Sequence, residues 1–374
     1  MRRRRDRLVE RRAGYGWVVL LTGLLCAPSL VLGLLLHWDL GVGLTMLGVL
    51  LAVVTPWLLE RRAQRVRPRT VLFLDWRTHY YGNSLVRGLR AELTLSGRPW
   101  EVHVWHPDER EPVEPAQQQI ETIRSGVLRG ADALVILPMV ASEALWDEVA
   151  RAMEAGVGVV MMDVHPPRDR FERSGQLPPF VVSTDYGVGG RLLADAIADA
   201  CDRDPTRQAL LLGGPPGVFA GEERARYCLY ELVARGYAER TQVRLLERWS
   251  LDAVTVTSLN DELAKSDRPW IVYAGYDGNV LTIQDDLVAR YPEARSRVEL
   301  IGYDCTTDEA QRVAVFDFGK ASGTVDVLPE AQGREAARIL IESRRDPSLL
   351  TSRAVVVRPM WVDRAVYAAR LAAH

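Results

Sequence analysis

Two uncharged, mostly apolar runs stand near the start of the chain, and short apolar runs alternate with amphipathic stretches after them. The first two runs extend from Ala13 to Leu36 and from Leu40 to Leu59. About 20 helical residues cross a hydrocarbon core of roughly 30 Å, so each run is long enough to span a membrane. Because only three residues separate the runs, we predict an antiparallel transmembrane helical hairpin that contacts the lipid bilayer through residues 14–59.

Arginines flank the predicted hairpin on its outer sides. Residues 1–69 contain twelve Arg and four acidic residues, with seven Arg before the first run, five after the second and none in the turn. Basic loops stay on the cytoplasmic side. We therefore predict a two-pass protein of the inner (cytoplasmic) membrane with both termini in the cytoplasm. Two alternatives are a hairpin buried in a soluble protein and a cleaved signal peptide that exports the rest of the chain.

The pattern after residue 69 predicts an α/β body. The runs Ala133–Leu137 and Val157–Met162 are apolar without alternation, which indicates strands buried on both faces of a parallel sheet covered by helices. The alternation of strands and helices begins again after Phe180–Thr184. We predict two lobes, each a doubly wound parallel sheet, and one final strand over Ala354–Val362. The expected domains are the tail and anchor (1–66), a first lobe (69–182 and 328–353) and a second lobe (183–327 and 354–374).

Charge and cysteine content narrow the function classes. The whole chain carries a formal charge of -2 and residues 1–69 carry +8, so the remaining residues carry -2 - 8 = -10. A basic cluster beside a membrane span indicates contact with anionic lipid, and we expect no nucleic-acid partner. The four Cys form no CxxC pair, so neither a zinc site nor a disulfide framework is indicated. We see no catalytic arrangement and expect no enzyme activity, metal or cofactor.

Polar and aromatic residues gather where the predicted strands end. In open parallel sheets, ligands bind outside these carboxyl ends. Carboxylates accept hydrogen bonds from hydroxyl groups, guanidinium groups donate them, and aromatic faces cover C–H surfaces, a combination that suits a neutral polyhydroxyl ligand. Asp277 is expected to cap the helix that follows its strand. The strand-end groups are Asp75-Trp76-Arg77, Asp163-Val164-His165, Gly275-Tyr276-Asp277 and Tyr303-Asp304.

Several segments of the chain, among them Tyr80–Gly88, Gly130–Pro138 and Ser183–Arg191, follow one another in a characteristic order. In this order they resemble the sugar-binding branch of the type I periplasmic binding protein superfamily, which includes ribose-binding proteins and the effector domains of the lactose-repressor family. The resemblance covers roughly residues 70–362 and implies a two-lobed periplasmic-binding-protein-like body. The segment that starts at Tyr80 resembles the family's entry into its first helix, and the segment that starts at Ser183 resembles the entry into its second lobe. The matching segments are Tyr80–Gly88, Gly130–Pro138, Ala155–Asp163, Ser183–Arg191, Leu212–Gly217, Ala274–Asp277 and Ile301–Asp304.

The resemblance also implies a set of ligand-binding residues. Asp163 and Asp304 match two acids that bind the ligand in the family, and Arg224, or Arg226 in the alternative register, matches its second-lobe Arg. Tyr81 stands where the family has a stacking Phe. The sequence departs from the family elsewhere, with Gly82, Val164 and Val327 where an aromatic, an Arg and a Gln are usual. The expected ligand-binding residues are His79, Tyr81, Asp163, Arg224, Tyr276 and Asp304.

These observations lead to one leading hypothesis and two alternatives. The leading hypothesis is a membrane-anchored sensor that binds a small, sugar-like ligand, closes about a hinge and signals to an unidentified protein partner. No helix-turn-helix pattern precedes the body, in contrast to the repressors. The first alternative is an exported substrate-binding component of a sugar ABC transporter or of a sensor kinase system. The second is a scaffold protein that binds no ligand.

Overall fold

The computed structural model divides the chain into two compact units, Met1–Pro68 and Arg69–His374. It describes residues 50, 54–55, 68–75, 80–108, 114–215, 219–248, 250–305, 323–344, 346–351 and 353–372. Within these ranges, no helix combines the length and the apolar character that a membrane span requires. The predicted hairpin lies almost entirely outside the described residues, so the lipid contact of residues 14–59 stays a prediction.

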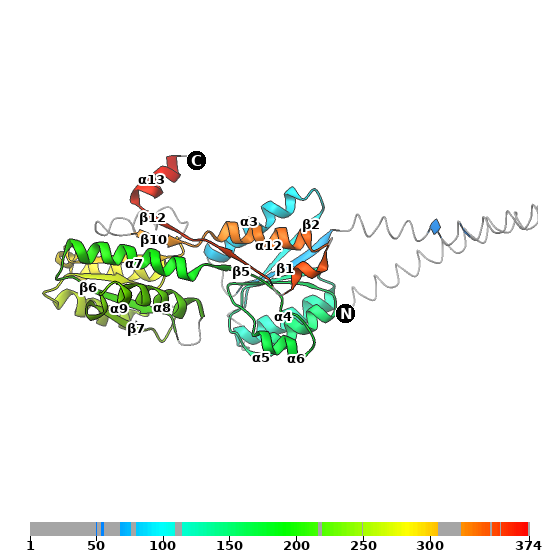
Figure 1. The fold of residues 1–374 in the computed structure, drawn as a ribbon, viewed down its shortest axis with the longest axis horizontal. Coiled ribbons are helices and arrows are strands. Elements are labelled where there is room, and N and C mark those ends of the chain that lie inside the picture. Colours follow the sequence, from blue (N-terminus) through cyan, green and yellow to red (C-terminus); the bar gives the residue numbers. More distant parts are fainter. Residues whose placement is uncertain are drawn as a thin grey trace, which may run out of the picture. The chain divides into compact units, whose positions relative to one another are not determined.

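The second unit contains two six-stranded sheets, each covered by helices (Figure 1). The strand order of the first sheet is β11-β5-β4-β3-β1-β2, and every pairing in it is parallel. Its inner strands are buried on both faces, as the uninterrupted apolar runs predict. These strands are β1 (Arg69–Leu74), β2 (Trp100–Trp105), β3 (Ala133–Ile136), β4 (Gly158–Met162), β5 (Phe180–Thr184) and β11 (Ala354–Val357).

Helices cover the first sheet, and Ser142 caps one of them by accepting a hydrogen bond from the backbone N–H of Leu145. The helix α12 returns to this lobe after the second sheet and packs against α3 and β5. The helical segments are α3 (Tyr80–Leu95), α4 (Pro115–Arg129), α5 (Glu143–Glu154), α6 (Arg168–Arg173), α12 (Pro329–Glu342) and the 3-10 turn η3 (Pro347–Leu350).

The second sheet has the order β12-β10-β9-β8-β6-β7. Its strands are β6 (Gln208–Gly213), β7 (Thr241–Leu245), β8 (Trp270–Tyr273), β9 (Val298–Tyr303), β10 (Gly323–Asp326) and β12 (Met360–Asp363). The helical segments in this part of the chain are α7 (Tyr186–Arg203), α8 (Phe219–Ala234), η1 (Ala238–Arg240), α9 (Ala253–Lys265), α10 (Asp277–Arg290), η2 (Pro292–Ser296) and α13 (Arg364–Ala372). The two-lobed α/β fold predicted from the sequence is therefore present.

The end of the chain differs from the prediction. The single strand expected over Ala354–Val362 is wrong, because β11 pairs in parallel with β5 of the first sheet and β12 pairs antiparallel with β10 of the second. Pro359 lies between these strands and lacks the N–H that a continuous ladder needs. Residues 354–357, which the prediction assigned to the second lobe, thus belong to the first sheet. Because β12 is antiparallel to β10, the second sheet is not purely parallel.

In the described part of the chain, the backbone passes between the two lobes at three places: from β5 to α7, from β10 to α12 and from β11 to β12. Each connection is short, since only one or two residues separate one element from the next. A pair of lobes joined by a few short segments can change its relative orientation by dihedral changes in those segments alone. The connections are therefore the places where a hinge motion would occur.

Two glycines bring α3 and α12 into close contact. A Cβ atom added to Gly333 of α12 would lie 2.0 Å from the carbonyl oxygen of Leu85, and one added to Gly88 of α3 would lie 2.0 Å from that of Glu330. Only a residue without a Cβ atom fits at either position, because backbone atoms occupy the space. This close packing fixes the position of Tyr81 on α3 relative to Gln332 on α12.

Candidate functional site

Two aspartates occupy equivalent places in the two lobes. Asp163 directly follows β4, and Asp304 directly follows β9. Both have left-handed backbone conformations, with φ of 60° at Asp163 and 88° at Asp304. Such conformations are unfavourable for residues other than glycine, although Asp tolerates them better than most, and they gather at functional sites. The structure therefore places two carboxylates at the carboxyl ends of the strands, where the sequence predicted a ligand site.

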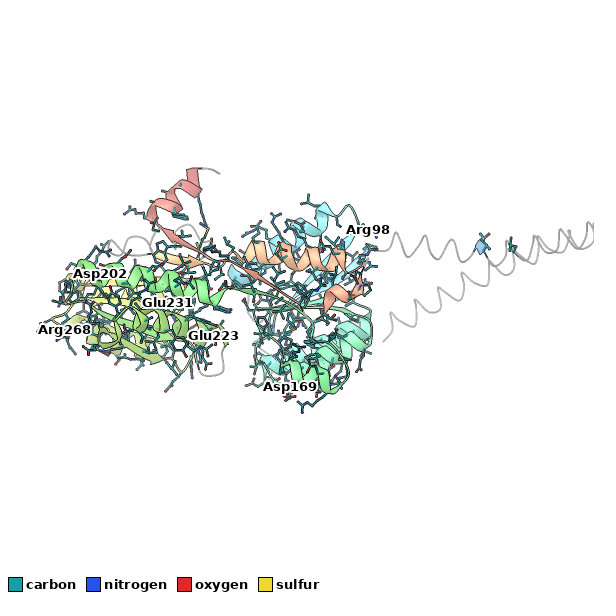
Figure 2. The ribbon with its side chains drawn as sticks, viewed as in Figure 1. Arg98, Asp169, Asp202, Glu223, Glu231 and Arg268 are labelled. Carbon is teal, nitrogen blue, oxygen red and sulfur yellow. The ribbon has the colours of Figure 1, made fainter. Side chains whose placement is uncertain are left out.

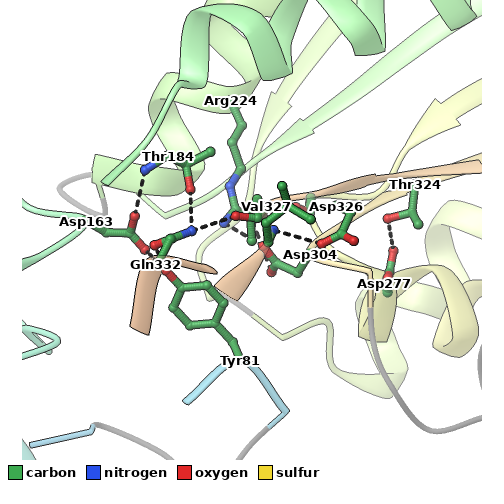
Figure 3. A network of polar contacts seen from close by, with 12 residues as sticks. Tyr81, Asp163, Thr184, Arg224, Asp277, Asp304, Thr324, Asp326, Val327 and Gln332 are labelled. Carbon is green, nitrogen blue, oxygen red and sulfur yellow. Dashed lines mark hydrogen bonds and ion pairs between the residues drawn. The ribbon is translucent and has the colours of Figure 1, made fainter. Parts of the chain in front are cut away.

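In the first lobe, Asp163 is the centre of a buried hydrogen-bond network (Figure 3). The hydroxyl group of Tyr81 contacts the Asp163 carboxyl group and lies 2.9 Å from Gln332 Oε1. The Gln332 amide nitrogen donates to Thr184 Oγ1 at 3.0 Å and to the Val327 carbonyl oxygen at 2.7 Å. The network thus joins the first lobe to the crossings that follow β5 and β10.

Burial gives Asp163 an unusual protonation equilibrium. Loss of solvent raises the pKa of its carboxyl group, although the hydrogen bond from Tyr81 and the charge of Arg224 act in the opposite direction. Burial and the neighbouring Asp163 also raise the pKa of the Tyr81 hydroxyl, so this group stays neutral. The Tyr81 hydroxyl donates to the Asp163 carboxyl group, and the backbone N–H of Thr184 donates to its Oδ1 at 3.3 Å. The Asp163 carboxyl group is therefore held in place by two donors of the first lobe.

In the second lobe, Arg224 of α8 forms a two-pronged ion pair with Asp304. Its Nη2 lies 2.8 Å from Asp304 Oδ1, and its Nη1 lies 3.2 Å from Asp304 Oδ2. The guanidinium group also lies 4.1 Å from the centre of the Tyr303 ring, within range of a cation–π interaction. Burial by itself lowers the pKa of Arg224, but Asp304 and the surrounding groups raise it above its ordinary value. Arg224 therefore carries a permanent positive charge in a site that is nearly closed to solvent.

Charged groups of the second lobe affect the pKa of Asp163 in the first lobe. The charge of Arg224 lowers the pKa of Asp163, and the charge of Asp304 raises it. Coulomb effects of this kind arise between charges that lie near one another, and Figure 3 shows the three side chains in one group. The structure therefore brings together four of the six predicted ligand-binding residues: Tyr81, Asp163, Arg224 and Asp304.

Of the other two predicted residues, His79 and Tyr276, the structure describes only Tyr276. His79 lies outside the described residues. Tyr276 lies at the carboxyl end of β8 as expected, and its hydroxyl group lies 2.9 Å from Ser250 Oγ. The alternative register with Arg226 is not supported, because that side chain is exposed and pairs with Glu223 on the same helix.

The expected role of Asp277 is wrong. Tyr276 occupies the N-cap position of α10, and Asp277 is the first helical residue. Its carboxyl group is buried and accepts a hydrogen bond from Thr324 Oγ1 at 2.7 Å. Asp277 thus connects α10 to β10 inside the second lobe.

Sequence reasoning missed Gln332 and Thr184, and it named Tyr303 among the strand-end groups but not among the ligand-binding residues. Gln332 is completely buried on α12, and a fully buried amide needs hydrogen-bond partners. The sequence contained a signal for it, because Gln332 stands on the otherwise apolar and small-residue face formed with Gly333, Ala336 and Ala337. The resemblance directed attention to Val327 instead, where the family commonly has Gln; the carbonyl oxygen of Val327 accepts from Gln332.

Metal binding has no support in the described ranges, where no group of three or more His, Cys, Asp or Glu side chains is arranged to hold an ion. The site also shows no nucleophile activated by a neighbouring base. Its chemistry is that of recognition: carboxyl oxygens that accept, a guanidinium that donates and tyrosine rings that present flat apolar faces.

Comparisons with known proteins agree with this fold. The family model described as "Periplasmic binding protein domain" matches residues 103–343. No match was found among curated proteins. Many solved structures share the fold, and three of them illustrate the likeness.

A periplasmic solute-binding protein of an ABC transporter from Actinobacillus succinogenes with bound D-allose is 19% identical, with a TM-score of 0.65 over 81% of this chain and 100% of that one. A periplasmic ribose ABC transporter structure from Conexibacter woesei is 19% identical, with a TM-score of 0.67 over 82% of this chain and 96% of that one. The Caulobacter myo-inositol binding protein with bound myo-inositol is 20% identical, with a TM-score of 0.63 over 83% of this chain and 100% of that one.

Proposed function

Because the chain belongs to the periplasmic binding protein domain family, we propose that it binds a small polyhydroxylated, sugar-like ligand at the cluster of Tyr81, Asp163, Arg224 and Asp304. The family is one of binding proteins, which agrees with the expectation of a non-enzymatic protein. The observation that carries the proposal is the pair of strand-end aspartates, one in each lobe, held in left-handed conformations at corresponding positions.

The chemistry of the cluster fits vicinal hydroxyl groups. Each carboxylate accepts from hydroxyls, and the guanidinium of Arg224 donates to hydroxyl or ring oxygens. The ring of Tyr81 provides apolar surface for the C–H face of a sugar ring. Ligands bound in the similar structures, D-allose and myo-inositol, have this character. A ligand held by groups from both lobes stabilises one relative orientation of the lobes and thereby couples binding to hinge motion.

Calorimetric titration of the full chain with pentoses, hexoses and inositols tests this proposal. The protein should be kept in a detergent without a sugar headgroup. We expect at least one saturable ligand, and we expect Asp163→Asn and Asp304→Asn each to weaken its binding about tenfold or more, since each removes hydrogen bonds to a charged group. Asn tolerates left-handed backbone, so either variant can keep the local backbone conformation.

Asp199→Asn is the matched control for both variants, because Asp199 is exposed on α7 and its replacement should leave the affinity unchanged. Saturable binding that neither site variant weakens would remove the site assignment. Absence of binding to the whole panel would instead favour the scaffold alternative.

We further propose that the body is a cytoplasmic sensor anchored to the inner membrane by the two predicted spans, with a protein partner that responds to closure. Its support is the sequence alone: two uncharged runs, and arginines on their outer sides only. The second candidate is an exported body that serves an ABC transporter, which is favoured by the similarity to the ABC transporter proteins from Actinobacillus succinogenes and Conexibacter woesei.

Protease treatment of intact spheroplasts distinguishes these two locations. A cytoplasmic body should resist digestion until the spheroplasts are lysed, whereas an exported body should be cut at once. An N-terminal tag that remains attached to the mature, membrane-bound chain would in addition exclude signal-peptide cleavage. Recovery of the chain in the soluble periplasmic fraction would contradict the anchor.

A further inference from the structure

Three arginines converge at the amino end of the first sheet, on the edge opposite to the carboxyl ends that carry the candidate ligand site. Arg69 is the first residue of β1, and its backbone pairs in register with Trp100, the first residue of β2. Arg98 precedes β2 by two positions, and Figure 2 shows it at this end of the lobe. Arg344 follows the end of α12 by two positions. Segments far apart in the sequence thus bring three guanidinium groups to one place.

A cavity of about 170 Å³ lies among these groups, lined by Ser96, Arg98, Trp100, Ile341 and Arg344. The Nε of Arg344 and the indole Nε1 of Trp100 are both buried and have no hydrogen-bond partner among the described residues. Guanidinium and indole N–H groups donate and cannot accept. An unsatisfied buried donor is unfavourable, so two of them beside one cavity indicate that the cavity is suited to an acceptor.

The charge of the three arginines also favours an anionic ligand. Burial, together with the positive charges of Arg69 and Arg98, holds the pKa of the Arg344 guanidinium below its ordinary value, and Asp132 only partly compensates. The Asp132 carboxylate is already engaged by the backbone N–H of Thr70 at 2.9 Å. Arg69 lies over the Trp100 ring, 5.8 Å from its centre, so a third positive charge stands beside a residue that lines the cavity. Three guanidinium groups against one carboxylate leave an excess of positive charge.

We propose that this cluster is an anion site for a phosphate group, formed by Arg98, Arg344 and the indole N–H of Trp100 and assisted by Arg69. Guanidinium groups bind phosphate through paired hydrogen bonds, and the cavity has room for an oxyanion that replaces several water molecules. The site is separate from the proposed sugar site. The phosphate can come from a free ion or from the headgroup of a phospholipid, and the chemistry of recognition is the same for both.

Binding to the full chain in a neutral detergent tests the proposal with two probes. The first is inorganic phosphate, titrated against sodium chloride at equal ionic strength. The second is short-chain phosphatidic acid, compared with the diacylglycerol that lacks the phosphate. We expect saturable binding of at least one probe, and we expect Arg98→Gln and Arg344→Gln to weaken it about tenfold or more. Arg268→Gln, which removes the same charge from an exposed position in the second lobe, should change nothing.

Thermal unfolding separates ligand binding from folding defects. Bound phosphate should raise the unfolding temperature of the wild type by mass action, and both cluster variants should lose this increase. Without phosphate, the Arg98 variant should unfold no earlier than the wild type, because it loses a like-charge contact and its side chain is exposed. Binding of phosphatidic acid alone would assign the lipid as the source, and binding of both probes would show that free phosphate suffices. If neither probe binds, or if the affinity is the same in the cluster variants, the proposal is overturned.

Discussion

Replacement of Arg224 by Met is expected to destabilise the second lobe by about 3–5 kcal/mol, the range observed when one partner of a buried ion pair is removed. Arg224 is only 4% exposed, and the Met side chain would fill similar space without any charge. Asp304 would then be left with an uncompensated charge in a site of low polarity. The measurement is the urea-induced unfolding of the full chain, followed by circular dichroism.

Two further variants give this prediction its controls. Arg244→Met changes the same residue type on β7 of the same lobe, where the side chain is 42% exposed and pairs with Glu262, itself 44% exposed, so it should cost less than about 1 kcal/mol. Arg224→Met combined with Asp304→Asn removes both charges and should recover part of the loss. If the Arg224 and Arg244 variants were equally stable, the buried ion pair would not contribute to stability, and its assignment to the centre of the site would be wrong.

Replacement of Gly333 by Ala is expected to separate α3 from α12 and to weaken both stability and ligand binding. The new Cβ atom would lie 2.0 Å from the carbonyl oxygen of Leu85 and 2.9 Å from the backbone nitrogen of Leu89. Backbone atoms cannot move aside singly, so the helices must shift, at a cost of about 1–3 kcal/mol. The shift would lengthen the hydrogen bond between Tyr81 and Gln332, now 2.9 Å. We expect a lower unfolding temperature and, for any sugar bound by the wild type, about tenfold weaker binding.

Gly126→Ala is the matched control in the same lobe. At this position in α4, the nearest atom to an added Cβ is the terminal carbon of the Leu72 side chain, at 2.7 Å. That side chain can rotate, and Ala favours a helix over Gly by about 1 kcal/mol. The Gly126 variant should therefore be as stable as the wild type or more stable, with unchanged ligand binding. Equal behaviour of the two variants would show that the close helix contact does not position the site.

Most of the fold could be predicted from local sequence patterns, and the end of the chain is the exception. Uninterrupted apolar runs such as Ala133–Leu137 are buried on both faces because a parallel sheet lies between helices, and they predict the inner strands. The last two strands could not be predicted correctly from such patterns. Residues 354–363 contain two short strands that join different sheets, and no local pattern states which sheet a short strand joins, because pairing depends on distant partners.

The candidate site could be predicted only in part, because some of its residues reach it only through contacts between distant segments of the chain. Asp163 and Asp304 could be placed at the carboxyl ends of buried strands, where ligands bind, and the family resemblance singled them out as ligand-binding residues. Gln332 was not found, because it reaches the site only through the contact of α12 with α3, which are far apart in the sequence. The arginine cluster was not found either, since Arg69, Arg98 and Arg344 carry no common motif.

The sequence by itself determined the inner strands of the body, their division between two α/β lobes and the acids at the strand ends. These features follow from the periodicity of apolar residues and from the direction of parallel strands, which are local properties. The tertiary structure alone decided which side chains share a buried environment: Tyr81 with Asp163 and Gln332, Arg224 with Asp304, and three arginines around Trp100. Such groupings depend on long-range packing, where a glycine contact or a short crossing sets the distance between groups that the sequence holds far apart.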